Sequence, residues 1–397
     1  MIRRNFIRLA GGGAVVAAVG VGTQAALTSG AYPAEATQAW QGPGSEADVR
    51  RRAVAYAITA PNPHNLQPWR VDLREPGVIT LTTDLQRVLP ETDPFGRQIL
   101  IGHGAFLELL VLALQAQGLA SRVDLWPQGD MPAALKKWDN RAVARIYLSK
   151  ATAGDAAADP LFKQVLNRRS PKTPFDATRP IAPDVLRALT EGIAGAGIKL
   201  GATIEAEQLV PLRRLCQQSA KAELLNAGSA LESQRLMRVG PTEILQHRDG
   251  ISMNSGFVRL LNSLGLFDRS KPPAEGSAAY SANISLYADN SNSAMGFVWL
   301  STPGNSRSQQ MEAGRAFVRL QLKSAELGLG LHPMSQALQE FAEMKPHYAN
   351  AHQLMLGKPA PESAQDETLQ MFCRLGYTAG AVLATPRRQI DKFVLTT

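Results

Sequence analysis

Hydrophobic residues recur through two long helical segments, the first of which is apolar on nearly every face. One covers residues 99–117 and ends at Gly118, and the other covers residues 307–327 and ends at Gly328. A helix that is apolar nearly all round is buried, and glycine just past the last turn is a common helix stop. The pattern therefore predicts two core helices, one in each part of the chain.

Shorter stretches of alternating or continuously apolar residues predict strands between other helical segments. Strands are expected at residues 70–73, 78–82, 122–126, 142–148, 198–204, 295–301 and 380–384. Helices are expected at residues 48–59, from about 182, at 208–225, and as a short apolar helix at 257–264. Both element types are thus interspersed along the chain.

The two core helices share a sequence pattern. Gly104, Leu110, Leu112, Gly118 and Leu119 recur 210 residues later as Gly314, Leu320, Leu322, Gly328 and Leu329. Leucine- and glycine-rich helices match easily by chance, but both copies end in Gly-Leu, so we interpret the pattern as a degenerate internal duplication. The small-residue segment 150–159 is the best candidate for the boundary between the two halves.

Length, composition and charge narrow the class of protein. A chain of 397 residues with 45% hydrophobic and 19% charged residues is an ordinary globular chain with room for two domains or one large one. A net charge of +8 suits an anionic ligand or a membrane surface. The sequence has no run of basic residues interleaved with aromatic residues, the pattern typical of nucleic-acid binding.

The N-terminus has the features of a twin-arginine signal. Arg3 and Arg4 precede a weakly apolar, glycine-rich run at residues 9–26, and Ala34-Glu35-Ala36 resembles a cleavage site. We expect a signal peptide at residues 1–36 and export of the folded protein to the periplasm. The alternatives are an uncleaved, membrane-anchored chain and a basic, disordered N-terminus.

The segment at residues 60–70, Ala-Pro-Asn-Pro-His-Asn-Leu-Gln-Pro-Trp-Arg, connects a predicted helix to a predicted strand. Three prolines exclude helix and central strand, so the segment is expected to be a stiff turn that fixes Asn65, Gln67 and Trp69. It is either a plain connector with a buried tryptophan or part of a binding site.

Two basic segments are candidate anion sites. Arg168, Arg169, Ser170 and Lys172 lie in one loop, and Arg387 and Arg388 follow a proline near the C-terminus. Arginine binds phosphate through a planar fork and lysine as a point charge. A solvated basic turn and a solvated tail are the alternative readings.

These segments resemble motifs of the nitroreductase family of flavoproteins, most closely its Acg-type branch, in which two nitroreductase-like halves are fused in one chain. The resemblance implies an α+β fold with a mostly antiparallel sheet in each half, at residues 37–150 and 151–397. It also implies that the halves form an intrachain pseudo-dimer with the core helices at their interface. One FMN per chain is expected, because the first half lacks its own basic motif, and the protein is expected to be a monomer.

The resemblance also implies the cofactor contacts. The phosphate would meet Arg168, Arg169, Ser170, Lys172, Arg387 and Arg388, and the other half would contribute Asn65 and Gln67. The loop after the second core helix would lie along the flavin ring through His332, Pro333, Met334 and Ser335. An acidic residue that many relatives carry in that loop is absent here.

The implied function is an oxidoreductase in which hydride passes from NAD(P)H or another donor through the flavin to a nitro- or quinone-like acceptor. Flavin N5 performs the chemistry, so no catalytic side chain is expected. The alternatives are a flavin-sequestering protein with little turnover and a flavin-free protein that binds other anions. Residues 246–280, expected to be irregular, are either a surface insertion or a lid over the site.

Other chemistries find little support. The chain has no G-x-S-x-G elbow and no P-loop. His347 and His352 are five residues apart, which does not place both on one helix face for a metal, and His103 is expected to be a satisfied core side chain. Pairing of Cys216 with Cys373 stays open.

Overall fold

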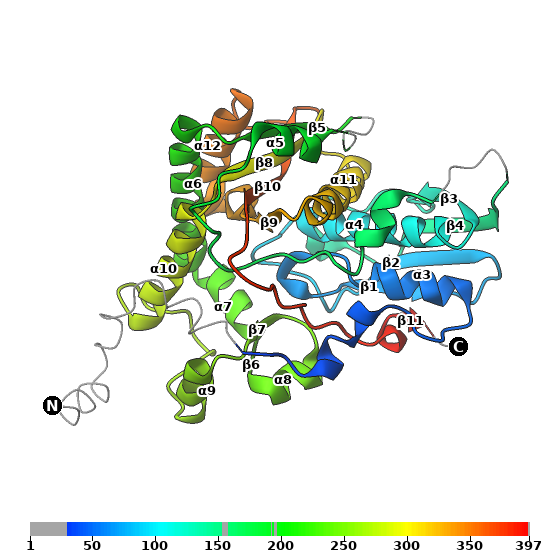
Figure 1. Cartoon of the computed structure of the whole chain (residues 1–397), viewed down its shortest axis with the longest axis horizontal. Coiled ribbons are helices and arrows are strands. Elements are labelled where there is room, and N and C mark those ends of the chain that lie inside the picture. Colours follow the sequence, from blue (N-terminus) through cyan, green and yellow to red (C-terminus); the bar gives the residue numbers. More distant parts are fainter. Residues whose placement is uncertain (1–29, 153–157, 192, 194–196, 396–397) are drawn as a thin grey trace.

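The computed structural model describes residues 30–152, 158–191, 193 and 197–395. Helices and strands combine in an α+β fold whose two sheets lie in neighbouring parts of the molecule (Figure 1). The expected α+β class is therefore confirmed. The boundary expected at residues 150–159 falls partly on residues outside the described part.

The first sheet has the order β11-β1-β2-β4-β3. Its strands are antiparallel except for β1 and β11, which are parallel. The bounds are β1 (Trp69–Asp72), β2 (Val78–Thr83), β3 (Leu119–Leu125), β4 (Ala142–Lys150) and β11 (Val394–Leu395). The C-terminal end of the chain thus returns to complete the first sheet.

The second sheet has the order β5-β8-β10-β9 and is antiparallel. Its strands are β5 (Lys199–Thr203), β8 (Gly296–Thr302), β9 (Gly330–Pro333) and β10 (Thr368–Gly376). A separate parallel pair joins β6 (Met237–Val239) to β7 (Ile251–Met253). Most predicted strands agree within a few residues.

The strand expected at residues 380–384 is wrong. These residues belong to no sheet, and Leu383 is 45% exposed. The strand that precedes them is β10, which is buried at every position. Burial on both faces removes the alternation that identifies a strand in sequence, which explains why β10 was not predicted.

The six helices expected from the sequence are all present, and four further helices of the described part, at residues 227–235, 240–247, 278–292 and 345–356, were not predicted. Together they are α3 (Val49–Ala57), α4 (Arg97–Gln115), α5 (Pro183–Thr190), α6 (Ala206–Leu225), α7 (Ala227–Arg235), α8 (Gly240–His247), α9 (Gly256–Ser263), α10 (Ala278–Asn292), α11 (Arg307–Glu326) and α12 (Lys345–Leu356). The core helices α4 and α11 are confirmed, and Ser306 starts α11 with a capping box to Gln309. Among the described helices, α4 alone is long and apolar enough to span a membrane, but it is mostly buried within the protein.

The two sheets have the same connectivity. The first is built from β1, β2, α4, β3 and β4 in chain order, and the second from β5, β8, α11, β9 and β10. In space the orders β1-β2-β4-β3 and β5-β8-β10-β9 correspond strand for strand. The second half differs by the helices α6 to α10, inserted between β5 and β8.

Helices α4 and α11 cross where two glycines meet. A Cβ on Gly104 would lie 2.0 Å from the backbone oxygen of Met311, and a Cβ on Gly314 would lie 2.0 Å from that of Ile101. Gly104 and Ile101 of α4 correspond to Gly314 and Met311 of α11, 210 residues later. Each glycine thus meets the counterpart of the residue that the other glycine meets, which is the reciprocal pattern of an isologous interface. Glu108 on α4 adds ion pairs of 2.8 Å to Arg315 and Arg319 on α11.

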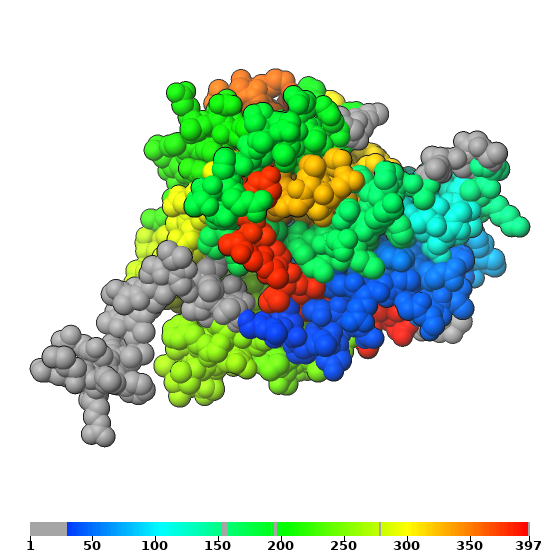
Figure 2. All heavy atoms as spheres, viewed as in Figure 1, coloured from blue at the N-terminus to red at the C-terminus, as the bar shows by residue number. Residues whose placement is uncertain are grey.

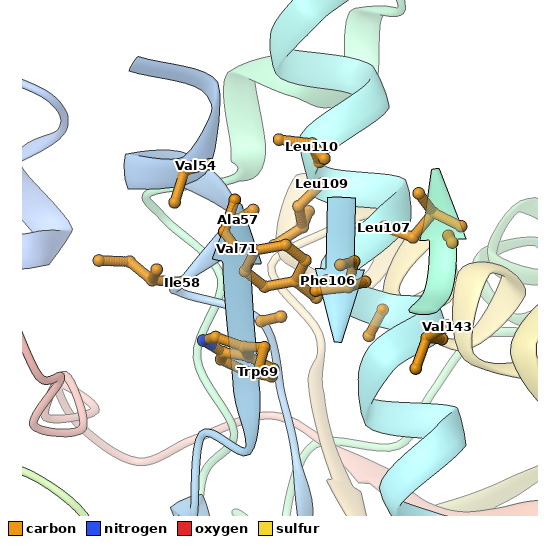
Figure 3. Close-up of a cluster of buried hydrophobic side chains, with 14 of the residues drawn as sticks. Val54, Ala57, Ile58, Trp69, Val71, Phe106, Leu107, Leu109, Leu110 and Val143 are labelled. Atoms are coloured by element: carbon orange, nitrogen blue, oxygen red, sulfur yellow. The ribbon is translucent and has the colours of Figure 1, made fainter. Parts of the chain in front are cut away.

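The largest described hydrophobic cluster fills the first half between α3, α4 and the first sheet (Figure 3). Trp69 is fully buried there, with its ring centroid 4.9 Å from that of Phe106. This position confirms the buried tryptophan of the proline-rich turn, and it anchors the turn to α4.

His103 is a satisfied core residue, as expected. Its Nδ1–H donates to the oxygen of Ile99 at 2.9 Å, and its Nε2 lies 3.3 Å from the Thr83 hydroxyl. Burial lowers the pKa of His103 to about 4.

We predict that His103→Gln flattens the acid limb of the stability profile. Between pH 4 and the ordinary histidine pKa of about 6.5, the unfolded chain binds a proton at His103 that the folded chain does not. Stability conferred by neutral His103 is thus present above pH ~6.5 and falls as the pH drops, by about 1.4 kcal/mol per pH unit. Urea titrations at pH 5 and 6 measure the slope. Buried Asp93 and His64 contribute equally to the slopes of both proteins, so the difference between the two slopes reports His103 alone. An unchanged slope in the variant contradicts the prediction.

Candidate functional site

The proline-rich turn connects α3 to β1 in an unusual backbone conformation. His64, Asn65 and Gln67 all have positive φ, at 50°, 52° and 53°. Such values are uncommon outside glycine and persist only where the surroundings hold them. The turn is therefore a rigid, over-determined structure, as its prolines predict.

Two side chains of the turn are bonded within the protein. Asn65 is 8% exposed, donates from Nδ2 to the Pro386 oxygen at 3.0 Å and accepts from Arg387 at 2.7 Å. Gln67 has no exposed surface and donates to the oxygens of Asn65 and Arg248 while accepting from the backbone N–H of Arg388. The structure thus brings Asn65 beside a predicted phosphate ligand, but it gives Gln67 a structural position in place of the expected cofactor contact.

The basic loop is only partly solvated. Arg168 is 2% exposed and donates to the Thr59 oxygen at 2.7 Å and to Gln321 of α11 at 2.9 Å. Gln321 also donates to the Ser170 hydroxyl at 3.1 Å. Arg168 Nε is buried without a partner. The solvated-turn alternative is therefore wrong for Arg168.

Arg387 reaches the same place from the C-terminus and is 4% exposed. Its guanidinium donates to the oxygens of Ile58, Thr59 and Ala60 at 2.9, 3.0 and 3.2 Å. These are carbonyls at the end of α3 that lack helical partners, so Arg387 caps that helix. Thr59 accepts from both Arg168 and Arg387, so the structure brings the two basic segments together. Figure 2 shows the C-terminal segment (red) crossing this face of the molecule towards the blue N-terminal segment.

Trp40 is the centre of this basic cluster and was not predicted. The guanidinium carbons of Arg168, Arg169 and Arg387 lie 5.2, 4.5 and 5.1 Å from its ring centroid, within cation–π range. Its indole N–H donates to the Thr385 oxygen at 2.8 Å. A lone tryptophan in a short loop carries no sequence signal of this role.

The cluster holds unpaired positive charge. Among the described residues, no carboxylate lies within ion-pair distance of Arg168, Arg169, Lys172 or Arg387. Burial and the neighbouring Arg169 lower the pKa of Arg168 to about 9. Burial, Arg168 and Arg169 lower the pKa of Arg387. Burying several cations without counter-charge is costly, so this arrangement suits a bound anion.

Lys172 extends the cluster towards the loop after α11. The residue is exposed, while burial of the amine and then the charge of Arg387 lower its pKa. Its charge helps to lower the pKa of both His64 and His332. Lys172 therefore lies between the basic cluster, the proline-rich turn and β9.

Two further expected ligands have side chains that lie away from the basic cluster. Arg388 points away from the cluster, with its guanidinium 4.8 Å from the Phe393 ring and electrostatically coupled to Asp84 and Asp249. Met334 is fully buried in the core with Leu338 and Phe372. Neighbouring residues of an extended chain face opposite sides, which explains why Arg387 and Arg388 diverge.

The remaining residues of the loop after α11 are partly accessible. His332 and Pro333 lie on β9, and Ser335 begins the following turn, η6 (Ser335–Leu338). All three are half-buried. The Ser335 hydroxyl lies 3.2 Å from the Phe372 oxygen, and the Nδ1 of His332 accepts from Arg374 at 3.0 Å.

The inserted segment packs on the proline-rich turn. Gly250 donates to the Asn65 oxygen at 3.3 Å, and Asp249 pairs with Arg87 at 2.6 Å. Residues 246–280 are not irregular as expected, because they include β7 and α9. The α9 region exposes Phe257, Leu260 and Leu264. Whether this segment acts as a lid stays a prediction.

The expected cleavage site lies inside the packed part of the protein. Residues Ala34–Ala36 form η1, Ala36 has no exposed surface, and its oxygen accepts from the Arg387 N–H at 2.8 Å. Cleavage after Ala36 would therefore have to precede the packing of this segment. The twin-arginine pattern itself lies outside the described residues.

Neither a disulfide nor a metal centre is present in the part of the chain that the structure describes. Cys216 and Cys373 are free, fully buried thiols, and burial raises the pKa of each. No group of three metal-ligating side chains occurs among the described residues. His352 is instead held by the Tyr348 oxygen and the Leu369 N–H.

No family model matches the sequence. The chain is 34% identical over 128 residues to the Mycobacterium tuberculosis protein "Putative NAD(P)H nitroreductase acg", which covers 32% of this chain and 36% of that protein. A second M. tuberculosis protein, uncharacterized, is 30% identical over 131 residues, or 32% of this chain and 36% of that protein. The chain thus spans about a third of the length of these curated relatives and is distantly homologous to them over that part.

Solved structures with partial similarity include nitroreductases. A Bacteroides fragilis nitroreductase with bound FMN is 16% identical, with a TM-score of 0.34 over 60% of this chain and 100% of that chain. A "putative nitroreductase" from Anabaena variabilis is 12% identical, with a TM-score of 0.45 over 86% of this chain and 91% of that chain.

Proposed function

We propose that the protein is an FMN-dependent oxidoreductase of the nitroreductase type, with one flavin bound between its two halves. The observation that carries this proposal is the buried, unpaired cationic cluster of Arg168, Arg169 and Arg387 beside Lys172. The partial homology to a protein named as an NAD(P)H nitroreductase, and the motif resemblance of the turn and the basic loop, support the same assignment.

The residues present fit a phosphate group. Arg168 Nε is a buried donor without a partner, Ser170 supplies a hydroxyl, and Lys172 is an exposed cation beside them. A phosphate would supply the missing counter-charge and several strong acceptors. Arg169 would hold it most directly, because Arg387 is occupied by the carbonyls at the end of α3 and Arg168 by Thr59 and Gln321.

When bound, FMN supplies hydride transfer between a reduced donor and an acceptor. The protein's own part is to bind and orient. Lys172 would add positive charge near the flavin ring, and His332 would add an N–H donor there. The rigid turn would hold Asn65, from the first half, in a fixed position at the site. NAD(P)H as donor and a nitro- or quinone-like compound as acceptor are the proposed partners.

The arrangement of the halves is part of this proposal. The reciprocal glycine crossing of α4 and α11 and the matching strand orders support an intrachain pseudo-dimer. The chain would then act as a monomer, with Arg168 and Lys172 from the second half and Asn65 from the first. Export through the twin-arginine pathway to the periplasm is proposed with it, on the sequence pattern alone.

We predict that Lys172→Ala weakens FMN binding about tenfold to a hundredfold, the loss of one charge-assisted contact of roughly 1.5–3 kcal/mol. Fluorescence titration with FMN measures the affinity. Lys163→Ala is the matched control, since Lys163 is an exposed lysine outside the cluster, and it should bind FMN as the unchanged protein does. Equal affinity of the two variants would exclude Lys172 from the site.

A flavin-sequestering protein with little turnover is the second candidate. Two hydrogen bonds favour it, from Gln67 to the Arg248 oxygen and from the Gly250 N–H to the Asn65 oxygen, because they hold the inserted segment against one side of the proposed site. Anaerobic addition of NADPH to the FMN-loaded protein separates the two. Rapid bleaching of the flavin colour supports the oxidoreductase, and persistence of the colour supports sequestration or another electron donor.

A further inference from the structure

Arg374 of β10 is a fully buried arginine whose hydrogen bonds go entirely to neutral groups. Nε donates to His332 Nδ1 at 3.0 Å, and the terminal nitrogens donate to four oxygens. These are Asn290 O at 2.9 Å, Ser293 Oγ at 3.2 Å, Pro171 O at 3.3 Å and Thr173 O at 2.8 Å. With five acceptors for five N–H groups, the guanidinium is saturated and its orientation is fixed.

The first consequence concerns the tautomer of His332. A guanidinium only donates hydrogen bonds and remains charged at neutral pH, so Nδ1 of His332 must present its lone pair. The single ring proton must then reside on Nε2. A second proton on Nδ1 would face the Arg374 N–H, so the imidazole cannot become cationic without breaking this contact.

The charged surroundings act in the same direction. Arg374 faces His332 from the paired position of the neighbouring strand, and Lys172 faces it from the basic loop. Burial, then Arg374 and Lys172, lower the pKa of His332 well below its ordinary value. His332 is thus a neutral donor that stays neutral in mildly acidic solution.

The second consequence concerns Lys172. Arg374 binds the carbonyls on both sides of this residue, those of Pro171 and Thr173, and stacks on Phe175 at 4.2 Å. The backbone that carries Lys172 is therefore fixed by the same guanidinium that fixes His332. One buried side chain sets the position of both a cationic and a neutral donor.

We propose that Arg374 is a positioning residue that locks His332 as an Nε2–H donor and aligns it with Lys172 to bind a carbonyl oxygen of the ligand. Among the described residues Nε2 has no hydrogen-bond partner. A neutral N–H beside an ammonium group suits a polarised oxygen such as a flavin ring carbonyl. The identity of this ligand rests on the proposed function, whereas the tautomer follows from the protein alone.

The direct test is ¹⁵N NMR of the histidine-labelled protein between pH 5 and 8, with the His332 signals assigned by their loss in His332→Gln. We expect Nε2 protonated and Nδ1 unprotonated across this range. In Arg374→Lys, which keeps the charge but loses the fork, His332 should titrate closer to its ordinary pKa of about 6.5. An Nδ1–H tautomer, or titration near 6.5 in the unchanged protein, overturns the proposal.

FMN titration tests the ligand. His332→Phe should bind FMN about fivefold more weakly, the loss of a neutral hydrogen bond. His332→Gln, whose amide N–H replaces Nε2–H, should recover most of that loss. Equal affinities of both variants and the unchanged protein overturn the donor role even if Arg374→Lys fails to fold. A protein with the expected tautomer but no FMN binding contradicts the proposed function and leaves the Arg374–His332 lock intact.

Discussion

Replacing Gly104 by alanine is expected to destabilise the protein by about 3 kcal/mol or more. The new Cβ would lie 2.0 Å from the Met311 oxygen and 3.0 Å from the Gly314 Cα, both of which are backbone atoms. No side chain can rotate away to relieve this overlap, so α4 and α11 must separate. The helix propensity gained over glycine, about 1 kcal/mol, is too small to compensate.

Urea denaturation of Gly104→Ala, Gly314→Ala and the double variant tests the reciprocal crossing. Each single change should cost a similar free energy of unfolding, and the double change should cost less than their sum, since the first alanine already separates the helices. Gly256→Ala is the control, because a Cβ there meets no atom within 4 Å. Near-native stability of Gly104→Ala would contradict the close contact.

Replacing Arg387 by alanine is expected to cost about 3–5 kcal/mol of stability and to weaken FMN binding. Three carbonyl oxygens at the end of α3 lose their donor, and Asn65 Oδ1 loses a bond of 2.7 Å. Each buried acceptor left unsatisfied costs about 1–3 kcal/mol. Relief of repulsion with Arg168 and Arg169 offsets part of this loss, so the net cost is smaller than the sum.

Arg388→Ala is the matched control one residue away. Its side chain points towards Phe393, so stability and FMN affinity should change little. Circular dichroism and FMN titration of the two variants measure both effects. If Arg388→Ala lost stability and FMN affinity while Arg387→Ala kept both, our assignment of the two arginines would be reversed.

The elements that hydrophobic pattern determines could be predicted from the sequence. Helices α4 and α11 have long apolar repeats and clear glycine stops, and β2, β4 and β8 were located within a few residues. β10 was missed because burial on both faces leaves no alternation. Residues 380–384 were misassigned because short apolar runs do not reveal whether they have strand partners.

The site was predictable where rare residue types are clustered, as in the proline-rich turn and the basic loop. It was not predictable where a role depends on contacts between distant segments. Trp40 meets three arginines from two places in the chain, and Arg374 joins residues about 40 to 200 positions away. A buried glutamine on an apolar helix, Gln321, was a signal that could have been used, since such a side chain must have a polar partner.

Purification of the full-length protein, followed by release and identification of its bound flavin, tests the central claim most directly. The cationic cluster predicts one FMN per chain in a monomer, present on purification or taken up stoichiometrically on titration. Loss of that flavin in Lys172→Ala but not in Lys163→Ala would tie it to the cluster. A colourless protein that takes up no FMN, or a dimer with FMN bound between chains, would contradict it.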